Sequence, residues 1–315
     1  MTVLHAVDIG LVVMILPLAV WTIAARETFV ATISFIAYGL LLTLVWVRLA
    51  APDVALTVAA IGSGLSGVLL LGAAARLRSV EARATAERPG PALRLAAAVL
   101  SAAVAAGLAA AVIYLPDPAP TLAPPVAEHL AATGVGNPVT GVLMAFRAMD
   151  TLLEKVVLLL ALIAVWSLAP DRFWGGRPGP RHQADPHGVL AFLARVLPPV
   201  GIVVGVYLLW VSADAPGGAF PASTVIAAMW LLVMMAGLTD TPPVSRRWLR
   251  LALIAGPALF FAVGLGGLWL GDAFLAYPVA WAKPLILVIE AGMLVTIAVT
   301  LGLLVAGAPE RNARP

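Results

Sequence analysis

The chain has 315 residues, of which 62% are hydrophobic and 11% are charged, and its mean hydropathy is +1.03. Soluble domains carry roughly 25% charged residues, so this composition excludes a soluble domain and indicates an integral membrane protein. Cysteine is absent, which excludes disulfides and thiolate metal sites.

Nine apolar stretches are each long enough to cross a membrane as a helix, which takes about 20 residues. We therefore predict an all-α polytopic membrane protein with about nine transmembrane helices. No lysine or arginine precedes Arg26, so the first stretch lacks the basic start of a secretory signal and we expect it to be a retained span. Pro17 and Pro257 fall inside spans and are expected to kink them. The predicted spans are 4–24, 28–48, 53–75, 93–115, 147–168, 190–211, 219–238, 249–271 and 284–307.

Arginine gathers in particular segments between the predicted spans. With nine spans, residues 76–94, 170–188 and 246–250 and the C-terminal tail all fall on one side of the membrane. Positive charge accumulates on the cytoplasmic face, so we predict a cytoplasmic C-terminus and an outside N-terminus. The pI of about 9.7 then reports orientation, and we expect no nucleic-acid partner. A reporter is expected outside at Thr133 and inside at Arg311.

The loop from Pro116 to Pro138 contains six prolines and is predicted to lie outside. Proline lacks a backbone N–H and disrupts a helix interior, so this loop cannot be regular helix throughout. We expect it to serve as a connection or as a contact with a neighbour.

The fifth predicted span begins with four ionisable residues, Arg147, Asp150, Glu154 and Lys155. A helix turns about 100° per residue, so the first three share one face, whereas Lys155 points about 100° away from Glu154. A charge in hydrocarbon costs at least ~2.5 kcal/mol unless it is paired or hydrated, and both signs are available here. Two interpretations stay open. In the first, these residues only anchor the end of the helix at the membrane surface. In the second, Glu154 and Lys155 belong to a polar path that moves ions.

The last predicted span carries Lys283 and Glu290, seven residues apart and therefore on one face. Glu290 lies roughly 10 Å along the span by helical rise and has apolar neighbours on both sides. An intramembrane carboxylate is a functional candidate by default. The alternative is an interhelical hydrogen bond with no role in transport.

Asp53 and Asp214 are weaker candidates. Asp53 follows Pro52 where the third span begins, and both residue types suit the first turn of a helix. Asp214 lies in Ser212 to Phe220, which we predict to be a tight hairpin loop whose glycines allow positive φ. A separate run of small residues is expected to be a helix-packing face, and it contains Gly62, Ser63, Gly64, Ser66 and Gly67.

Motifs of enzymes and metal sites are missing from the sequence. The four histidines, His5, His129, His182 and His187, fall at ends or in loops and form no clustered set. No catalytic triad, dinucleotide fingerprint or zinc spacing is visible. We therefore expect no enzyme active site, no metal site and no cofactor.

Three stretches resemble the Mrp-type (multisubunit) cation/proton antiporters and their relatives in membrane-bound hydrogenases. Residues 51–57, Ala-Pro-Asp-Val-Ala-Leu-Thr, look like the Ala-Pro-Asp-x-Ala-Leu-Thr segment in the C-terminal region of the large A subunit. Residues 146–154 look like that region's Phe-Arg-Gly-Phe-Asp-Thr-x-Gly-Glu motif. Asp214, Pro216-Gly217-Gly218 and Phe220 resemble the Pro-Gly-Gly-Gly-Phe hairpin of the B subunit, whose last span usually carries an acidic residue, here Glu290.

The chain departs from these motifs at several positions. Val58 stands where an acidic residue often follows the Ala-Leu-Thr run, which leaves the role of the first motif in transport open. Ala145 replaces an aspartate that often precedes Phe-Arg, and Ala148 and Leu153 replace the two glycines of that motif. Pro221 stands where Gln or Ile commonly follows the hairpin phenylalanine.

The resemblance implies a membrane subunit of a multisubunit cation/proton antiporter in the plasma (inner) membrane of a bacterium or archaeon. It implies other membrane subunits as partners, including large proton-pumping antiporter-like subunits, and Na⁺ and H⁺ as transported ions. An alternative is a subunit in the membrane arm of a redox-driven complex, such as a membrane-bound hydrogenase, with static structural charges. A self-contained secondary transporter is a third possibility, and the lack of a convincing internal repeat argues against it.

The resemblance also divides the chain into three parts. Residues 1–92 form a three-helix segment that resembles the C-terminal region of the large A subunit and ends in a basic cytoplasmic loop. Residues 93–188 form a two-helix segment with the Phe-Arg motif, and residues 189–315 form a four-helix domain like the B subunit. Such a fusion of normally separate pieces suggests a dedicated subunit that supplies both at a stoichiometry of one to one.

Overall fold

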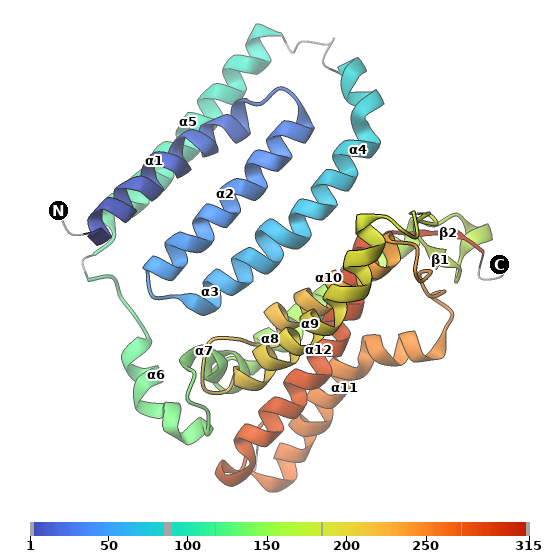
Figure 1. Cartoon of the computed structure of the whole chain (residues 1–315). Coiled ribbons are helices and arrows are strands. Elements are labelled where there is room, and N and C mark those ends of the chain that lie inside the picture. Colours follow the sequence, from blue (N-terminus) through green and yellow to red (C-terminus); the bar gives the residue numbers. More distant parts are fainter. Residues whose placement is uncertain (1–2, 85–89, 117, 184, 272, 313–315) are drawn as a thin grey trace.

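A computed structural model describes residues 3–84, 90–116, 118–183, 185–271 and 273–312, most of which are helical (Figure 1). Proline opens three of the helices, because its fixed φ suits a first helical turn. The long helices are α1 Val3–Ala24, α2 Thr28–Arg48, α4 Ser66–Ala84, α5 Pro91–Tyr114, α8 Ala148–Ser167, α9 Val189–Val211, α10 Ala219–Met235, α11 Arg247–Leu270 and α12 Ala282–Ala306. The shorter ones are α3 Pro52–Thr57, α6 Ala123–His129 and α7 Pro138–Gly141.

Seven helical stretches in the described part of the chain are long and apolar enough to cross a membrane. They contain α1, α2, α3 with α4, α5, α9, α11 and α12. Helix α8 has 20 residues but carries Asp150, Glu154 and Lys155, and α10 is apolar but has only 17 residues. These two helices account for the difference between seven and the nine spans we predicted, and the count of nine stays a prediction.

The first part of the chain forms a row of helices in which α2 lies between α1 and the α3–α4 segment (Figure 1). Residues Val58–Leu65 between α3 and α4 are π-helical, which the sequence did not predict. Two of the small residues expected to form a packing face lie close to α2: Ser63 lies against Gly39, and a side chain at Gly67, in α4, would collide with Ile36. Every described residue of α5 is exposed.

The second part of the chain is a bundle built around α12. Helix α12 packs against α8, α10 and α11, and its inward side chains form the centre of the main hydrophobic core. Ile286, Ile289 and Ile297 of α12 are fully buried beside Phe260 of α11. Gly256 of α11 lets the two helices approach closely, because any side chain at this position would collide with the backbone of Met293.

The Pro116–Pro138 loop holds α6 and a 3₁₀ turn, Leu130–Thr133, and leads into α7, which begins at Pro138. It is therefore not regular helix throughout, as the prolines predicted. Pro17 and Pro257 lie inside α1 and α11.

Basic segments from distant parts of the sequence meet at one end of the bundle. A short antiparallel pair, β1 (Arg177–Pro178) and β2 (Pro309–Arg311), ties the 170–188 loop to the tail. Asp240, in the loop between α10 and α11, pairs with Arg177, Arg181 and Arg311 at 3.7, 3.5 and 3.0 Å. Arg76 lies 3.9 Å from Glu310. This arrangement agrees with the prediction that these basic segments share one side of the membrane, although Arg88 and Arg314 lie outside the described residues.

We expect Asp240 to stabilise this end of the fold in a pH-dependent way. Burial raises the pKa of Asp240, but the hydrogen bond and charge of Arg311 and the nearby Arg181 and Arg177 outweigh it and hold the pKa below the ordinary 3.8. A lowered folded-state pKa contributes stability that is present above the ordinary value and is lost as the pH falls through the folded value. Asp240→Asn should therefore lower stability at pH 7 by roughly 1 kcal/mol.

The measurement is the thermal midpoint of the purified chain and of Asp240→Asn between pH 7 and pH 3. The gap between the two proteins should shrink as the pH falls. A gap that stays constant, or is absent at pH 7, would show that the three-arginine contact contributes nothing measurable.

The orientation of the chain is testable because the sequence contains no cysteine. Thr133 is buried and Arg311 is bonded in β2, so exposed neighbours are better sites for a label. We expect Ala127→Cys to react with an impermeant maleimide from outside intact cells, and Ser245→Cys to react only after the membrane is opened. Labelling of both from the same side would contradict the nine-span topology.

Candidate functional site

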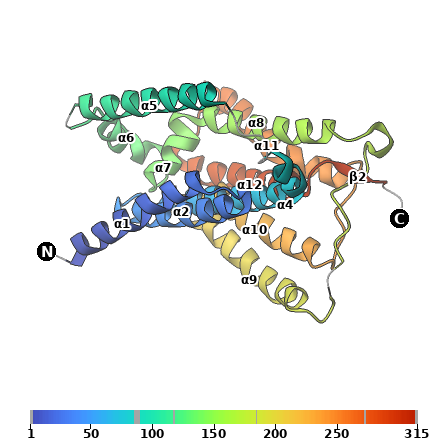
Figure 2. The same ribbon diagram turned by 90° about the horizontal axis from the view of Figure 1, so that it is seen from above.

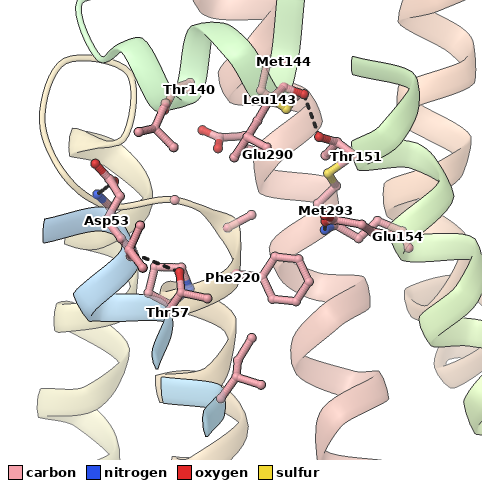
Figure 3. A pocket seen from close by; sticks show the side chains of 18 residues that line it. Asp53, Thr57, Thr140, Leu143, Met144, Thr151, Glu154, Phe220, Glu290 and Met293 are labelled. Atoms are coloured by element: carbon pink, nitrogen blue, oxygen red, sulfur yellow. Dashed lines mark hydrogen bonds and ion pairs between the residues drawn. The ribbon is translucent and has the colours of Figure 1, made fainter. Parts of the chain in front are cut away.

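A cavity of about 410 Å³ lies where α3, α7, α8, α12 and the loop before α10 meet (Figure 3). Four of the eight residues singled out from the sequence line it: Asp53, Glu154, Lys155 and Glu290. The other four do not line it and form two exposed ion pairs instead. Arg147 pairs with Asp150 at 2.5 Å, and Lys283 pairs with Asp214 at 2.5 Å.

Lys155 is the most unusual residue of this cavity, because only 2% of its side chain is exposed. Its Nζ atom lies 3.1 Å from the Oε2 atom of Glu154 and 3.6 Å from the centre of the Phe220 ring. The two side chains leave α8 about 100° apart, as the helical spacing predicted, yet the lysine is long enough to fold back onto its neighbour. Glu154 itself is half exposed, at 52%, so its carboxylate connects the buried ammonium with the outside of the chain.

The start of α8 differs from the single helix that we predicted from residue 147. Residues Val142–Phe146 form a π-helical turn, and Arg147 has a non-helical backbone with φ −130° and ψ 37°. Arg147 is therefore the residue before the helix rather than part of a helical face shared with Glu154, and its partner is Asp150.

Backbone carbonyls at this interruption are satisfied by side chains. The hydroxyl of Thr151 donates to the Leu143 carbonyl at 2.6 Å, and that of Tyr277 donates to the Met144 carbonyl at 3.0 Å. An unpaired backbone group away from water costs several kcal/mol, so these hydroxyls make the irregular backbone tenable beside the cavity.

Glu290 of α12 is buried, with 6% of the residue exposed. The hydroxyl of Ser212 donates to its Oε2 atom at 2.5 Å. The sequence suggested Lys283 as its partner because the two share a helical face, but Lys283 bonds Asp214 at the exposed end of the helix. Lys155 is the cation that faces the same cavity as Glu290.

Residues 212–220 join α9 to α10 and include the first two residues of α10, and we call this segment the hairpin. The N–H of its Gly217 donates to Asp53 Oδ1 at 3.0 Å, its Phe220 ring covers Lys155, and its Ser212 bonds Glu290. Gly218 has φ 125°, so the expectation of positive φ is confirmed there. Gly217 is needed for a different reason, since a side chain would collide with the Leu208 carbonyl.

Several polar residues of this region were missed from the sequence. Asn137 donates its side-chain amide to the Ala215 carbonyl at 3.1 Å, and Thr140 donates to the Ser212 carbonyl at 2.6 Å. Asn137 also caps α7, and an Asn-Pro pair ahead of a helix was the available signal. The spacing of Ser212 and Thr151 in the sequence does not identify them as residues of the site. The partner of Ser212, Glu290, lies far along the chain, and the partner of Thr151, Leu143, lies on an irregular turn.

The chemistry of the cavity is that of three carboxylates and one ammonium, with hydroxyl and backbone donors beside them. Carboxylates accept protons or bind cations, and the ammonium can change partner between them. The described residues contain no group of three His, Asp or Glu side chains that could hold a metal ion.

Two protein families match separate parts of the chain. Residues 13–79 match MbhD of the MBH complex, and residues 189–309 match a domain related to the MnhB subunit of the Na⁺/H⁺ antiporter. The two matched stretches are thus similar to subunits of the MBH complex and of the Na⁺/H⁺ antiporter. The resemblance drawn from the three motifs is thereby confirmed, including its relation to membrane-bound hydrogenases. A comparison with curated proteins finds no match.

Two solved structures share the fold of this chain. A chain of the Mrp complex from Dietzia sp. DQ12-45-1b superposes with a TM-score of 0.75 at 23% identity, over 97% of this chain and 35% of that one. A chain of the membrane-bound sulfane sulfur reductase (MBS), an archaeal respiratory membrane complex, superposes with a TM-score of 0.54 at 23% identity, over 67% of this chain and 97% of that one. The chain thus spans about a third of the length of the Dietzia chain and shares the fold of that part.

Proposed function

We propose that the chain is a membrane subunit of a multisubunit cation/proton antiporter and that its cavity is a station on the ion path. The observation that carries this proposal is the buried Lys155, which lies between the half-exposed Glu154 and the buried Glu290 in one cavity. Intramembrane charges are rare, and they mark ion and proton pathways when they face a cavity. If the Lys155–Glu154 pair only stabilised the fold, its ammonium would not have to be buried away from water.

The mechanism we favour uses Lys155 as a movable charge. In the structure it pairs with Glu154. When a proton or Na⁺ arrives at Glu154, it weakens that pair, and the ammonium moves toward Glu290 on the other side of the cavity. The displaced charge then favours release of a proton held at Glu290 toward a neighbouring protein of the complex. We place Arg147, Asp150, Asp214 and Lys283 outside this path, because their pairs are exposed and do not line the cavity.

The partners we propose are other membrane subunits of an Mrp-type complex, including large antiporter-like subunits, with Na⁺ and H⁺ as the transported ions. The two similar structures are of complexes, which supports a partner-dependent role. We also propose the three-part division at residues 92 and 188, nine spans, a cytoplasmic C-terminus, and the plasma membrane of a bacterium or archaeon.

The experiment that tests this function compares the chain alone with the chain in its complex. The purified chain in proteoliposomes should show no cation/proton exchange, because the path needs subunits on both sides of the cavity. The same chain co-purified with its partner subunits should exchange Na⁺ for H⁺. Robust exchange by the chain alone would favour a self-contained transporter. A complex that moves ions only when given an electron donor would favour the redox-driven alternative.

A further inference from the structure

Two hollows lie next to one another on the face of α9 and α10, away from the cavity described above. One is an apolar groove of about 390 Å³ lined by α9, α10 and the start of α11. The other is a polar pocket of about 420 Å³ lined by residues 181–183 and the 236–240 loop. Thr239 and Asp240 line both, so the groove and the pocket meet at that loop.

The groove has the character of a site for a hydrocarbon chain. Along α10 it runs from Ile226 to Val233, which is roughly 10 Å by helical rise. Ile202 of α9 and Trp248 of α11 stand half exposed at its rim, and Trp230 lies inside it. Figure 2 shows α9 at the outer edge of the bundle beside α10.

A cluster of arginines lies at the end of this groove, and one of them, Arg181, lines the polar pocket. Arg177, Arg181 and Arg311 share the single carboxylate of Asp240, which leaves two net positive charges in the cluster. The Nη2 atom of Arg311 is buried without a hydrogen-bond partner. Arg181, the most exposed of the three at 59%, lines the pocket and has donors to spare for an anion.

Arg195 is a second cation, on the face of α9 that carries the groove. On α9, Pro198 follows Arg195 by three residues and Ile202 follows it by seven. At this helical spacing all three lie on the same face, and Pro198 and Ile202 line the groove. The side chain of Arg195 is exposed and has no hydrogen bond or ion pair with any described residue. A guanidinium in an apolar helix is expensive to leave without a counter-charge, and one near the helix end reaches the headgroup level.

We propose that this face binds an anionic phospholipid. One acyl chain lies in the groove between α9 and α10, and the phosphate is held by Arg195 and Arg181 at the mouth of the polar pocket. Tryptophans at 230 and 248 suit the boundary between acyl chains and headgroups. A lipid without net negative charge would leave Arg195 and the excess charge of the three-arginine cluster uncompensated, so the site selects anionic lipid.

The test is native mass spectrometry of the full chain titrated with phosphatidylglycerol or with phosphatidylcholine. The wild type should retain phosphatidylglycerol selectively. The double variant Arg181→Gln/Arg195→Gln should bind it about 25-fold more weakly, since each arginine near an anionic headgroup contributes about fivefold. Arg94→Gln is the control, because Arg94 is also exposed near the start of an apolar helix, here α5, and has no side-chain hydrogen bond or ion pair with any described residue. It should bind as the wild type does.

A second measurement locates the lipid without relying on the arginine variants. Phosphatidylglycerol with brominated acyl chains should quench the tryptophan fluorescence of the wild type, and Trp230→Phe/Trp248→Phe should lose that part of the quenching. Equal binding of both lipids, or equal weakening in Arg94→Gln and in the double variant, would overturn the proposal. So would a cross-link from Ile202→Cys to another protein of the intact complex, because that protein would then occupy the groove.

Discussion

Replacing Glu154 by glutamine should abolish cation/proton exchange while the complex still assembles. Glutamine keeps the size of the side chain, and its oxygen can still accept a hydrogen bond from Lys155, whose ammonium also keeps its contact with the Phe220 ring. It cannot ionise, so it can neither carry a proton nor bind a cation. We expect roughly a hundredfold loss of exchange, the size expected when a positioned proton-transfer group is removed.

The measurement pairs co-purification of the partner subunits with Na⁺/H⁺ exchange in inverted vesicles. Glu128→Gln is a matched control, because Glu128 is exposed on α6 and does not line the cavity. Glu290→Gln should assemble and show a smaller loss than Glu154→Gln, since Ser212 can still bond the amide. If the charges were purely structural, loss of one partner would leave the other charge buried and unpaired, which would destabilise the fold by ~3–5 kcal/mol. A Glu154→Gln complex that falls apart would favour that scaffold role, and one that is intact and fully active would end the ion-path proposal.

Lys155→Met should abolish exchange while leaving the thermal stability of the protein unchanged or raised, which is the opposite of what a variant that damages the fold would show. Methionine has a similar length, packs well against the Phe220 ring and removes a charge from a site with 2% exposure. Glu154 is half exposed, so it is not left as a buried, uncompensated charge. Replacing a buried charge by a well-packed apolar side chain is often neutral or stabilising, by about 1–4 kcal/mol for whole ion pairs.

The chain contains one other lysine, which makes the control direct. Lys283→Met removes an exposed pair with Asp214, and such pairs contribute roughly 0–1 kcal/mol. Exchange should therefore persist in Lys283→Met and vanish in Lys155→Met, with thermal midpoints recorded for both in detergent. A large drop in the midpoint of Lys155→Met, or normal exchange by it, would contradict the role of a movable charge.

The sequence predicted the helices well, because apolar length and proline position decide where a helix can lie in a bilayer. The observed α2 spans Thr28–Arg48, and residues 28–48 were expected. Periodicity could not predict the π-helical turns at 58–65 and 142–146, since a turn with one extra residue leaves composition unchanged. It was also silent on the β1–β2 pair, whose strands have only two and three residues.

Different sequence features predicted different parts of the site. Charge in an apolar span found Glu154, Lys155 and Glu290, and the structure places all three on one cavity. Helical spacing alone suggested partners on the same helix, and it misplaced Lys283, because the partners of Glu290 come from the hairpin. Contacts between residues far apart in sequence, such as Ser212 with Glu290, follow from the packing of the hairpin and not from any local pattern.

The hairpin has a consequence for how the cavity is assembled. Asp53 and Gly217 touch although 164 positions separate them, and Ser212 and Glu290 touch across 78. On separate polypeptides these contacts would form only as fast and as fully as the subunits met in the membrane. Within one chain their effective concentration is fixed by the connecting segments and does not depend on expression level. The cavity is therefore complete whenever the chain is folded, in every copy and at any dilution.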